Sequence, residues 1–229
     1  MTSRHSVWQM TSDLTLQNIR LTEIRAADGG AVLCFTVEYS NGRELVRKPL
    51  CAFSARLSRL PVVGALDAAR FEELCHEDEV YRAICTGLRA LAGSDPSAAQ
   101  LRHKLRASGN SAEVTEEAIQ VLEERGYINE VRGALCACER ELKKLRGDRR
   151  ILAELRAKGY GDEGLAAVRE RLAEQDAVER CRALLRKKRI KVPEEQREMQ
   201  KLIAALVRYG YAAGEIRAAL QVDIEDFEI

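Results

Sequence analysis

The residues with the clearest chemical potential are cations, because lysines and arginines gather in the middle of the chain. Residues 141–191 hold 16 Lys/Arg against 9 Asp/Glu, whereas the whole chain has a net charge of only +1. Ten of these cations form two dense clusters, called here the basic stripe: Lys143, Lys144, Arg146, Arg149, Arg150, Arg186, Lys187, Lys188, Arg189 and Lys191. Such a stripe can bind phosphates or an acidic protein groove. The alternative is a solvated helix face with cations near the helix ends.

Cysteine and histidine are spaced unfavourably for a metal site. Cys136 and Cys138 lie two positions apart in a predicted helix and therefore point about 200° apart. The sequence has no Cys-x-x-Cys pair, and His5, His76 and His103 are far from one another. A structural zinc site needs four converging ligands. We therefore expect no metal and no cofactor, and we expect most of the seven cysteines to be small buried residues in a reducing compartment.

No motif in the sequence suggests catalysis. A glycine-rich phosphate loop, a nucleophile elbow and a His-Glu-x-x-His pair are all absent. The longest apolar runs, residues 31–37 and 60–66, are far shorter than the roughly 18 residues that a membrane helix needs. The first 16 residues contain no apolar block of signal-peptide length. We therefore predict a cytoplasmic protein that is not an enzyme and does not bind membranes.

The first fifty residues predict a small antiparallel β-meander. Residues 18–26, 31–39 and 43–53 alternate apolar and polar positions or are rich in strand formers. Asp-Gly at positions 28–29 and Asn-Gly at 41–42 separate these runs and suit hairpin turns. Pro49 indicates that the third strand ends early or lies at an edge of the sheet.

From about residue 67 the apolar spacing becomes that of helices. Asp67 is the predicted N-cap of the first helix, and Gly93 is the predicted residue just beyond its end. Asp95 and Asp148 are predicted caps of later helices. A charged content of 32% with only four prolines also favours a mainly helical protein.

An internal repeat is the strongest pattern in the sequence. Three segments carry apolar residues eight and four places before a glycine, and these glycines (Gly109, Gly159 and Gly210) lie 50 and 51 residues apart. The apolar spacing forms a helix stripe, and the glycine ends the helix in the left-handed conformation. One helix precedes each segment and another follows it, so each unit consists of three helices.

The predicted fold is therefore mainly α, with three tandem three-helix repeats in an elongated array behind a small antiparallel β-meander and a linking helix. Residues 1–66 form the β-rich segment, and residues 67–129 form the linking helix and the first repeat. The second repeat takes residues 130–175, and the third takes 176–229 with an acidic tail, residues 223–229. Trp8 and the acidic tail show no pattern that assigns them a place.

With this repeat and order of elements, the sequence resembles the RecX family, the regulators of the RecA recombinase. The resemblance rests on the segments 101–110, 151–160 and 202–211, together with residues 121–130 and 147–159, and it covers roughly residues 77–220. The family has tandem three-helix repeats. The chain departs from the family at Gly133, where an aromatic residue is usual. It departs again at residues 135–137, where basic and aromatic residues are usual.

The resemblance implies a protein that binds RecA and its DNA filament. Such a protein modulates the recombinase, ATPase and coprotease activities of RecA in DNA repair and the SOS response, with inhibition as the expected direction. The basic stripe would then face DNA or an acidic wall of the filament groove. We expect a monomer, and direct binding of single- or double-stranded DNA stays open. The alternative is a helical-repeat DNA-binding protein or adaptor that does not act on RecA.

Overall fold

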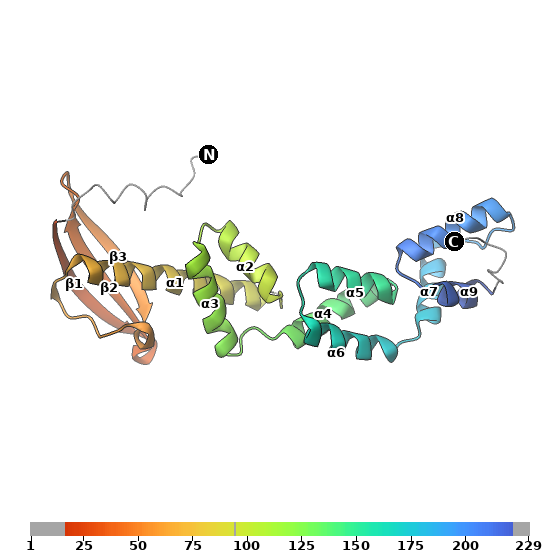
Figure 1. Ribbon diagram of the computed structural model, residues 1–229, viewed down its shortest axis with the longest axis horizontal. Helices are drawn as coiled ribbons and strands as arrows, with labels where there is room; N and C mark the ends of the chain where they lie inside the picture. Colours follow the sequence, from red (N-terminus) through yellow and green to blue (C-terminus); the bar gives the residue numbers. More distant parts are fainter. Residues whose placement is uncertain (1–16, 94, 222–229) are drawn as a thin grey trace. The chain divides into compact units, whose positions relative to one another are not determined.

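The computed structural model describes residues 17–93 and 95–221 (Figure 1). Trp8 and the acidic tail lie outside this range. The described part contains four strands followed by nine α-helices. Among its helices, none is long and apolar enough to cross a membrane. The mainly helical fold behind a small sheet agrees with the prediction from the sequence.

The sheet contains the three predicted strands and one that no sequence pattern indicates. Strands β1 (Gln17–Ala27), β2 (Val32–Ser40) and β3 (Leu45–Phe53) form the predicted antiparallel meander. The short β4 (Gly64–Ala65) pairs antiparallel with β1, so the strand order is β3-β2-β1-β4. A strand of two residues is too short to show alternation. Pro49 lies on the edge strand β3, as predicted.

Helix α1 (Ala68–Gly93) packs on one face of the sheet (Figure 1). Phe71 and Leu74 of α1 share a core with buried side chains of all three long strands. The predicted cap is confirmed, because the backbone N–H of Arg70 donates to Asp67 Oδ1 at 2.7 Å. Gly93 is the last helical residue and does not have a positive φ, so its predicted role just beyond the helix is wrong.

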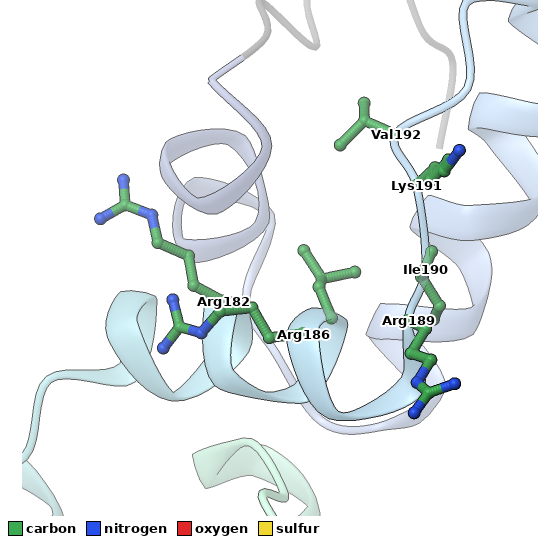
Figure 2. Close-up of a pocket in the computed structure, with 7 residues that line it drawn as sticks. Arg182, Arg186, Arg189, Ile190, Lys191 and Val192 are labelled. Carbon is green, nitrogen blue, oxygen red and sulfur yellow. The ribbon is translucent and has the colours of Figure 1, made fainter.

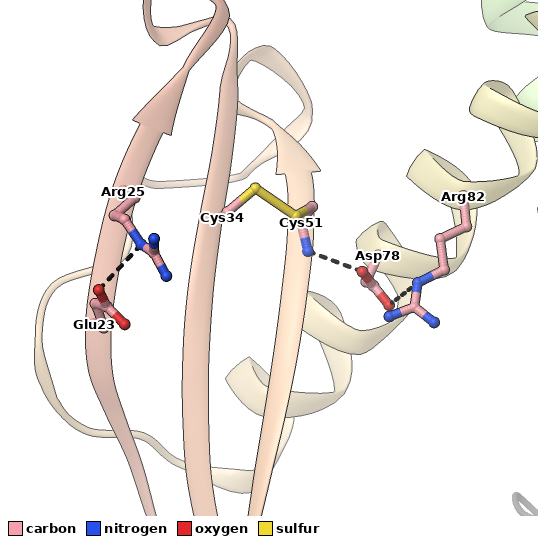
Figure 3. The surroundings of a disulfide bond; sticks show 6 residues. All are labelled: Glu23, Arg25, Cys34, Cys51, Asp78 and Arg82. Atoms are coloured by element: carbon pink, nitrogen blue, oxygen red, sulfur yellow. Dashed lines mark hydrogen bonds and ion pairs between the residues drawn. A yellow bond between two sulfur atoms is a disulfide. The ribbon is translucent and has the colours of Figure 1, made fainter.

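Cys34 and Cys51 lie directly opposite each other on β2 and β3 and form a disulfide (Figure 3). A disulfide is not expected from the sequence, which predicts that most of the cysteines are buried residues in a reducing compartment. The register of β2 and β3 places these two side chains opposite each other. Cys75, Cys138 and Cys181 are buried, as expected of small hydrophobic residues. Burial raises the pKa of both Cys138 and Cys181 to about 11.

Figure 3 also shows how α1 is fastened to the edge of the sheet. The backbone N–H of Cys51 donates to Asp78 Oδ1 at 2.8 Å, and the other oxygen of this carboxylate pairs with Arg82 at 2.9 Å. Burial, the largest influence, raises the pKa of Asp78 above its ordinary value. A buried acid on α1 thus satisfies a backbone donor of β3.

The remaining helices pack in groups along the chain. Their bounds are α2 (Ala98–Ala107), α3 (Ala112–Glu124), α4 (Glu130–Lys143), α5 (Asp148–Ala157), α6 (Asp162–Ala173), α7 (Ala177–Lys188), α8 (Gln196–Arg208) and α9 (Ala213–Leu220). Helices α4, α5 and α6 enclose one core, which includes Ile151 and Leu155. Helices α7, α8 and α9 enclose another, which includes Ile203 and Leu206. The repeat boundaries at 129/130 and 175/176 stay predictions.

The chain divides into two compact units. One comprises Met1–Ala90 with Leu101–Tyr127, and the other comprises Leu91–Gln100 with Ile128–Ile229. The basic stripe belongs entirely to the second unit. The three repeat glycines end their helices as predicted, with φ of +94° at Gly109, +77° at Gly159 and +99° at Gly210.

The two predicted later caps, Asp95 and Asp148, are wrong. Ser97 caps α2 instead, because its Oγ accepts a backbone N–H of that helix at 3.1 Å. Asp148 is the first residue of α5, and its carboxylate pairs with the buried Arg180 of α7. Burial, the largest influence, raises the pKa of Asp148 despite the charge of Arg180. Asp95 pairs with Arg132 at 2.8 Å. Both acids therefore make contacts distant in sequence, which a local pattern does not reveal.

Candidate nucleic-acid interface

The first half of the basic stripe lies where α4 ends and α5 begins. Lys143 is the last residue of α4, Lys144 and Arg146 lie in the connection, and Arg149 and Arg150 lie in the first turn of α5. Lys143, Lys144 and Arg149 are exposed, whereas Arg146 and Arg150 are partly buried. Cations at the end of α4 complement the negative end of the helix dipole.

Glu141, in the last turn of α4, holds part of this half in place. Its carboxylate is buried, with 2% of the residue exposed. Lys144 Nζ donates to Glu141 Oε1 at 2.9 Å, and Arg146 pairs with Oε2 at 2.7 Å. Burial has the largest effect on the Glu141 pKa and raises it. The Lys144 hydrogen bond and the charges of Arg146, Lys144 and Lys158 outweigh burial, so the pKa is lowered. An ionised Glu141 therefore orients Lys144 and Arg146.

The second half of the stripe lies at the end of α7. Arg186, Lys187 and Lys188 form the last turn, and Arg189 ends the helix in the left-handed conformation with φ +53°. Lys191 follows in the connection to α8, and all five residues are exposed. The run of cations is therefore presented at a helix end, where the dipole favours positive charge.

An open pocket lies beside this second half (Figure 2). It is lined by Arg182, Leu185, Arg186, Arg189, Ile190, Lys191 and Val192. Two of its apolar residues face solvent, because Ile190 is 36% and Val192 is 45% exposed. Figure 2 shows Arg182 and Arg186 on the helix and the other labelled side chains on the connection that follows it. The pocket thus combines positive charge with exposed apolar surface.

The two halves of the stripe meet at the end of α8. Arg150 Nη1 donates to the carbonyl oxygen of Arg208 at 3.1 Å, and Lys188 Nζ lies 4.9 Å from the centroid of the Tyr209 ring. A hydrogen bond from Lys188, the largest cause, lowers the pKa of Tyr209. The charges of Lys188, Arg150 and Arg146 act in the same direction. One cation of the second half therefore contacts the Tyr209 ring, and one cation of the first half is bonded to the residue before it.

Tyr209 is not marked as a functional residue by any sequence pattern. The residue stands just before the helix-ending glycine of the third repeat, and its position outside the basic runs gives no sign of a role. Aromatic rings among cations are the usual means by which proteins bind single-stranded nucleic acid, because bases stack on the ring while cations contact phosphates. The structure therefore adds an aromatic residue to the predicted basic stripe.

Close backbone contact brings the two halves together. The backbone N–H of Gly147 donates to the carbonyl oxygen of Tyr209 at 2.9 Å. A Cβ on Gly147 would lie 2.3 Å from the carbonyl carbon of Gly210, so only glycine fits there without a backbone shift. The hydroxyl of Tyr211 donates to the carbonyl oxygen of Leu145 at 2.8 Å. These contacts hold the connection before α5 against the turn after α8.

The same contact occurs one repeat earlier. The hydroxyl of Tyr160 donates to the carbonyl oxygen of Asp95 at 2.9 Å, as Tyr211 does to Leu145. A Cβ on Gly133 would lie 3.0 Å from that Asp95 oxygen and 3.2 Å from Tyr160 Cε1. This close packing accounts for glycine at a position where the family resemblance leads one to expect an aromatic residue.

The cations of the stripe differ in how strongly acids neutralise them. Four pair with carboxylates: Lys144, Arg146, Arg150 and Arg186. Lys188 contacts the Tyr209 ring instead. The remaining five have neither an acidic partner nor an aromatic contact among the described residues: Lys143, Arg149, Lys187, Arg189 and Lys191. These five are the cations most available to a ligand, and their role in binding stays a prediction.

The structure offers no arrangement for metal chemistry in the part that it describes. Across residues 17–93 and 95–221, no three or more His, Cys, Asp or Glu side chains are grouped so as to hold a metal ion. Cys136 is exposed and Cys138 is buried, so the two thiols of the Cys-x-Cys motif do not point to a common site.

Tandem groups of helices behind a small sheet define a helical-repeat protein. Solved structures support this class at the level of the fold. A crystal structure of regulatory protein RecX covers 89% of this chain and 100% of its own, with a TM-score of 0.66 and 16% sequence identity. A RecX structure from Lactobacillus salivarius covers 63% of this chain and 96% of its own, with a TM-score of 0.53 and 21% identity.

Sequence relatives carry the assignment further. The chain is 32% identical over 143 residues to regulatory protein RecX of Halorhodospira halophila, covering 62% of this chain and 88% of the relative. It is 31% identical over 138 residues to that of Vibrio vulnificus, covering 59% and 88%. No profile of a protein family matches the chain. The chain belongs to the RecX family of regulatory proteins, as the resemblance predicts.

Proposed function

We propose that this protein binds RecA and its DNA filament and modulates, with inhibition as the expected direction, the recombinase, ATPase and coprotease activities of RecA. Membership of the RecX family is the observation that carries this proposal. The protein acts by binding, in the cytoplasm and as a monomer, and needs no catalytic residue or cofactor of its own.

The repeated architecture supports binding to a filament. The repeat glycines recur every 50 or 51 residues, and the Tyr160 and Tyr211 contacts recur with them. A filament also presents identical sites at regular intervals, so several repeats can engage successive protomers. Each further contact then forms at high effective concentration, which raises the overall affinity.

The basic stripe is the part that meets DNA or an acidic protein wall. Its two halves meet at Arg208 and Tyr209, where cations can contact phosphates while the Tyr209 ring stacks on a base. Single-stranded DNA suits this combination better than a duplex, because unpaired bases expose their faces. The stripe contributes to RecA-filament binding through this contact.

A charge-reversal experiment tests the role of the stripe. K187E/K191E and K143E/R149E each change the net charge by −4 and alter cations without an acidic partner. R169E/R197E, which alters two exposed cations outside the stripe, is the matched control. Both stripe variants should bind RecA–DNA filaments more weakly in co-sedimentation, and the control should bind as the unaltered protein does. Equal binding by all three variants would overturn the assignment of the stripe.

The second candidate is a helical-repeat DNA-binding protein or adaptor that does not act on RecA. Recognition helices that enter the major groove carry polar and basic residues near their N-termini. Here the corresponding helices begin with acids: Glu113 in α3, Asp162 and Glu163 in α6, and Glu215 in α9. These acids repel phosphates and count against major-groove binding. An adaptor would leave the activities of RecA unchanged.

A further inference from the structure

The pocket beside α7 has a composition that phosphate binding alone does not explain. Four of its lining residues are cations: Arg182, Arg186, Arg189 and Lys191. The other three are Leu185, Ile190 and Val192, and the last two expose apolar surface to solvent. A phosphate needs the cations but gains nothing from the aliphatic side chains. The better-matched ligand is a peptide that alternates carboxylates with apolar side chains.

Such a peptide is present in this chain. The acidic tail reads Asp-Ile-Glu-Asp-Phe-Glu-Ile and contains four acids, three large apolar residues and no cation. Glu179 pairs with Arg186 at 2.5 Å and with Arg182 at 4.0 Å, so the pocket keeps a net positive charge that the acids of the tail complement. The apolar residues of the tail match the exposed Ile190 and Val192 in kind.

The end of α9 brings the chain to the pocket. Arg182, which lines the pocket, donates from Nη2 to the carbonyl oxygen of Ala218 at 2.8 Å. Ala218 lies in the last turn of α9, which ends at Leu220, and Gln221 follows with φ +58°. The seven residues of the acidic tail can extend about 24 Å from that region. The described part of the chain therefore ends close to one wall of the pocket, within reach of a seven-residue tail.

We infer that the acidic tail docks in this pocket, with its carboxylates on Arg182, Arg186, Arg189 and Lys191 and with Ile224 and Phe227 against Ile190 and Val192. Because the tail is tethered to α9, its effective concentration at the pocket is in the millimolar range, and even weak contacts keep it bound. The docked tail covers Arg186, Arg189 and Lys191 of the basic stripe. It therefore competes with any anionic ligand of the stripe, a consequence that rests on the proposed function.

The test uses the full-length chain with four neutral substitutions in the tail: D223N, E225Q, D226N and E228Q. Amide resonances of residues 182–192 report directly on docking and do not depend on DNA or RecA. We expect them to shift between this variant and the unaltered protein, and to shift in the same way when salt is raised, because salt screens ion pairs at the surface. Resonances that stay in place under both changes would overturn the inference.

A second variant and a binding measurement separate docking from general charge effects. I224S/F227S keeps the acids and should produce part of the same resonance shifts, since it removes the apolar contacts. If the tail occupies the pocket nine-tenths of the time, neutralising it should tighten binding to an oligo(dT) probe about ten-fold. The control E123Q/D162N/E163Q/E170Q makes the same charge change at exposed acids elsewhere and should tighten binding much less.

The two hypotheses fail in different ways. Resonance shifts without measurable oligo(dT) binding by any variant would support docking and count against DNA as a ligand of the stripe. Equal tightening by the tail variant and the control, with unmoved resonances, would overturn docking and leave DNA binding by the stripe in place.

Discussion

Replacing Gly147 by alanine tests the contact that brings the two halves of the basic stripe together. Gly147 is the N-cap residue of α5, with φ −75° and ψ 159°, a backbone conformation that alanine adopts freely. Its added Cβ would lie 2.3 Å from both the carbonyl carbon and oxygen of Gly210 and 2.4 Å from the backbone nitrogen of Tyr211. Backbone atoms cannot rotate away as a side chain does, so the turn after α8 must move.

Gly161 provides a matched control. It is the N-cap residue of α6 with φ −75° and ψ 178°, and its added Cβ would meet only Glu130 Oε2, at 2.9 Å. That oxygen is at the end of a flexible side chain. Changes in capping and in unfolded-chain entropy are therefore similar in G147A and G161A, and they cancel in the comparison. The remaining difference is the overpacking at Gly147, about 1–3 kcal/mol of unfolding free energy.

Hydrogen exchange of the α8 and α9 amides measures this difference locally, without assuming that the whole chain unfolds together. G147A should lower the opening free energy of these amides by about 2 kcal/mol more than G161A does, roughly a 30-fold faster exchange. It should also weaken oligo(dT) binding, because Arg150 and Lys188 lose their common position around Tyr209. Equal exchange rates in the two variants would refute the role assigned to the Gly147–Gly210 contact.

Three further predictions concern other parts of the protein. Y209L should weaken oligo(dT) binding by about 1–3 kcal/mol in fluorescence anisotropy, and Y209F should retain it, since stacking needs the ring and not the hydroxyl. E141Q should lower the unfolding free energy at pH 7, because the unaltered Glu141 is ionised and its folded-state pKa is lowered. The difference in unfolding free energy between E141Q and the unaltered protein should shrink as the pH falls below the ordinary Glu range and Glu141 protonates. A difference that persists at low pH would contradict the ionic role. Reducing the Cys34–Cys51 disulfide, which spans 17 residues, should cost the sheet about 3 kcal/mol in urea unfolding, and a C34S/C51S variant should show no effect of reductant.

Local patterns predicted most of the fold because they act within a few residues. The alternation in residues 18–53 and the turn residues between the runs define the three long strands. Helix-ending glycines could be recognised because a positive φ is a local requirement, and the structure confirms it at Gly109, Gly159 and Gly210. The strand β4 and the true partners of Asp95 and Asp148 could not be predicted, since each depends on a residue distant in the chain.

The candidate site was predictable in composition but not in arrangement. The runs around Lys144 and Lys187 stand out in the sequence as charge. Their convergence on Tyr209 depends on the Gly147–Gly210 contact, which joins segments more than sixty residues apart and has no local signature. The buried Glu141, which fixes two of the cations, also looks like an ordinary helix acid in the sequence. Sequence therefore indicates which charges are present, and the fold decides which are free.

The most direct test of the central claim is the single-stranded-DNA-dependent ATPase of the cognate RecA, titrated with this protein. The ATPase rate should fall at substoichiometric ratios of this protein to RecA. K187E/K191E should need a higher ratio than R169E/R197E to produce the same fall. An unchanged rate at stoichiometric ratios, with no co-sedimentation on RecA–DNA filaments, would contradict the claim and favour a DNA-binding protein or adaptor that does not act on RecA.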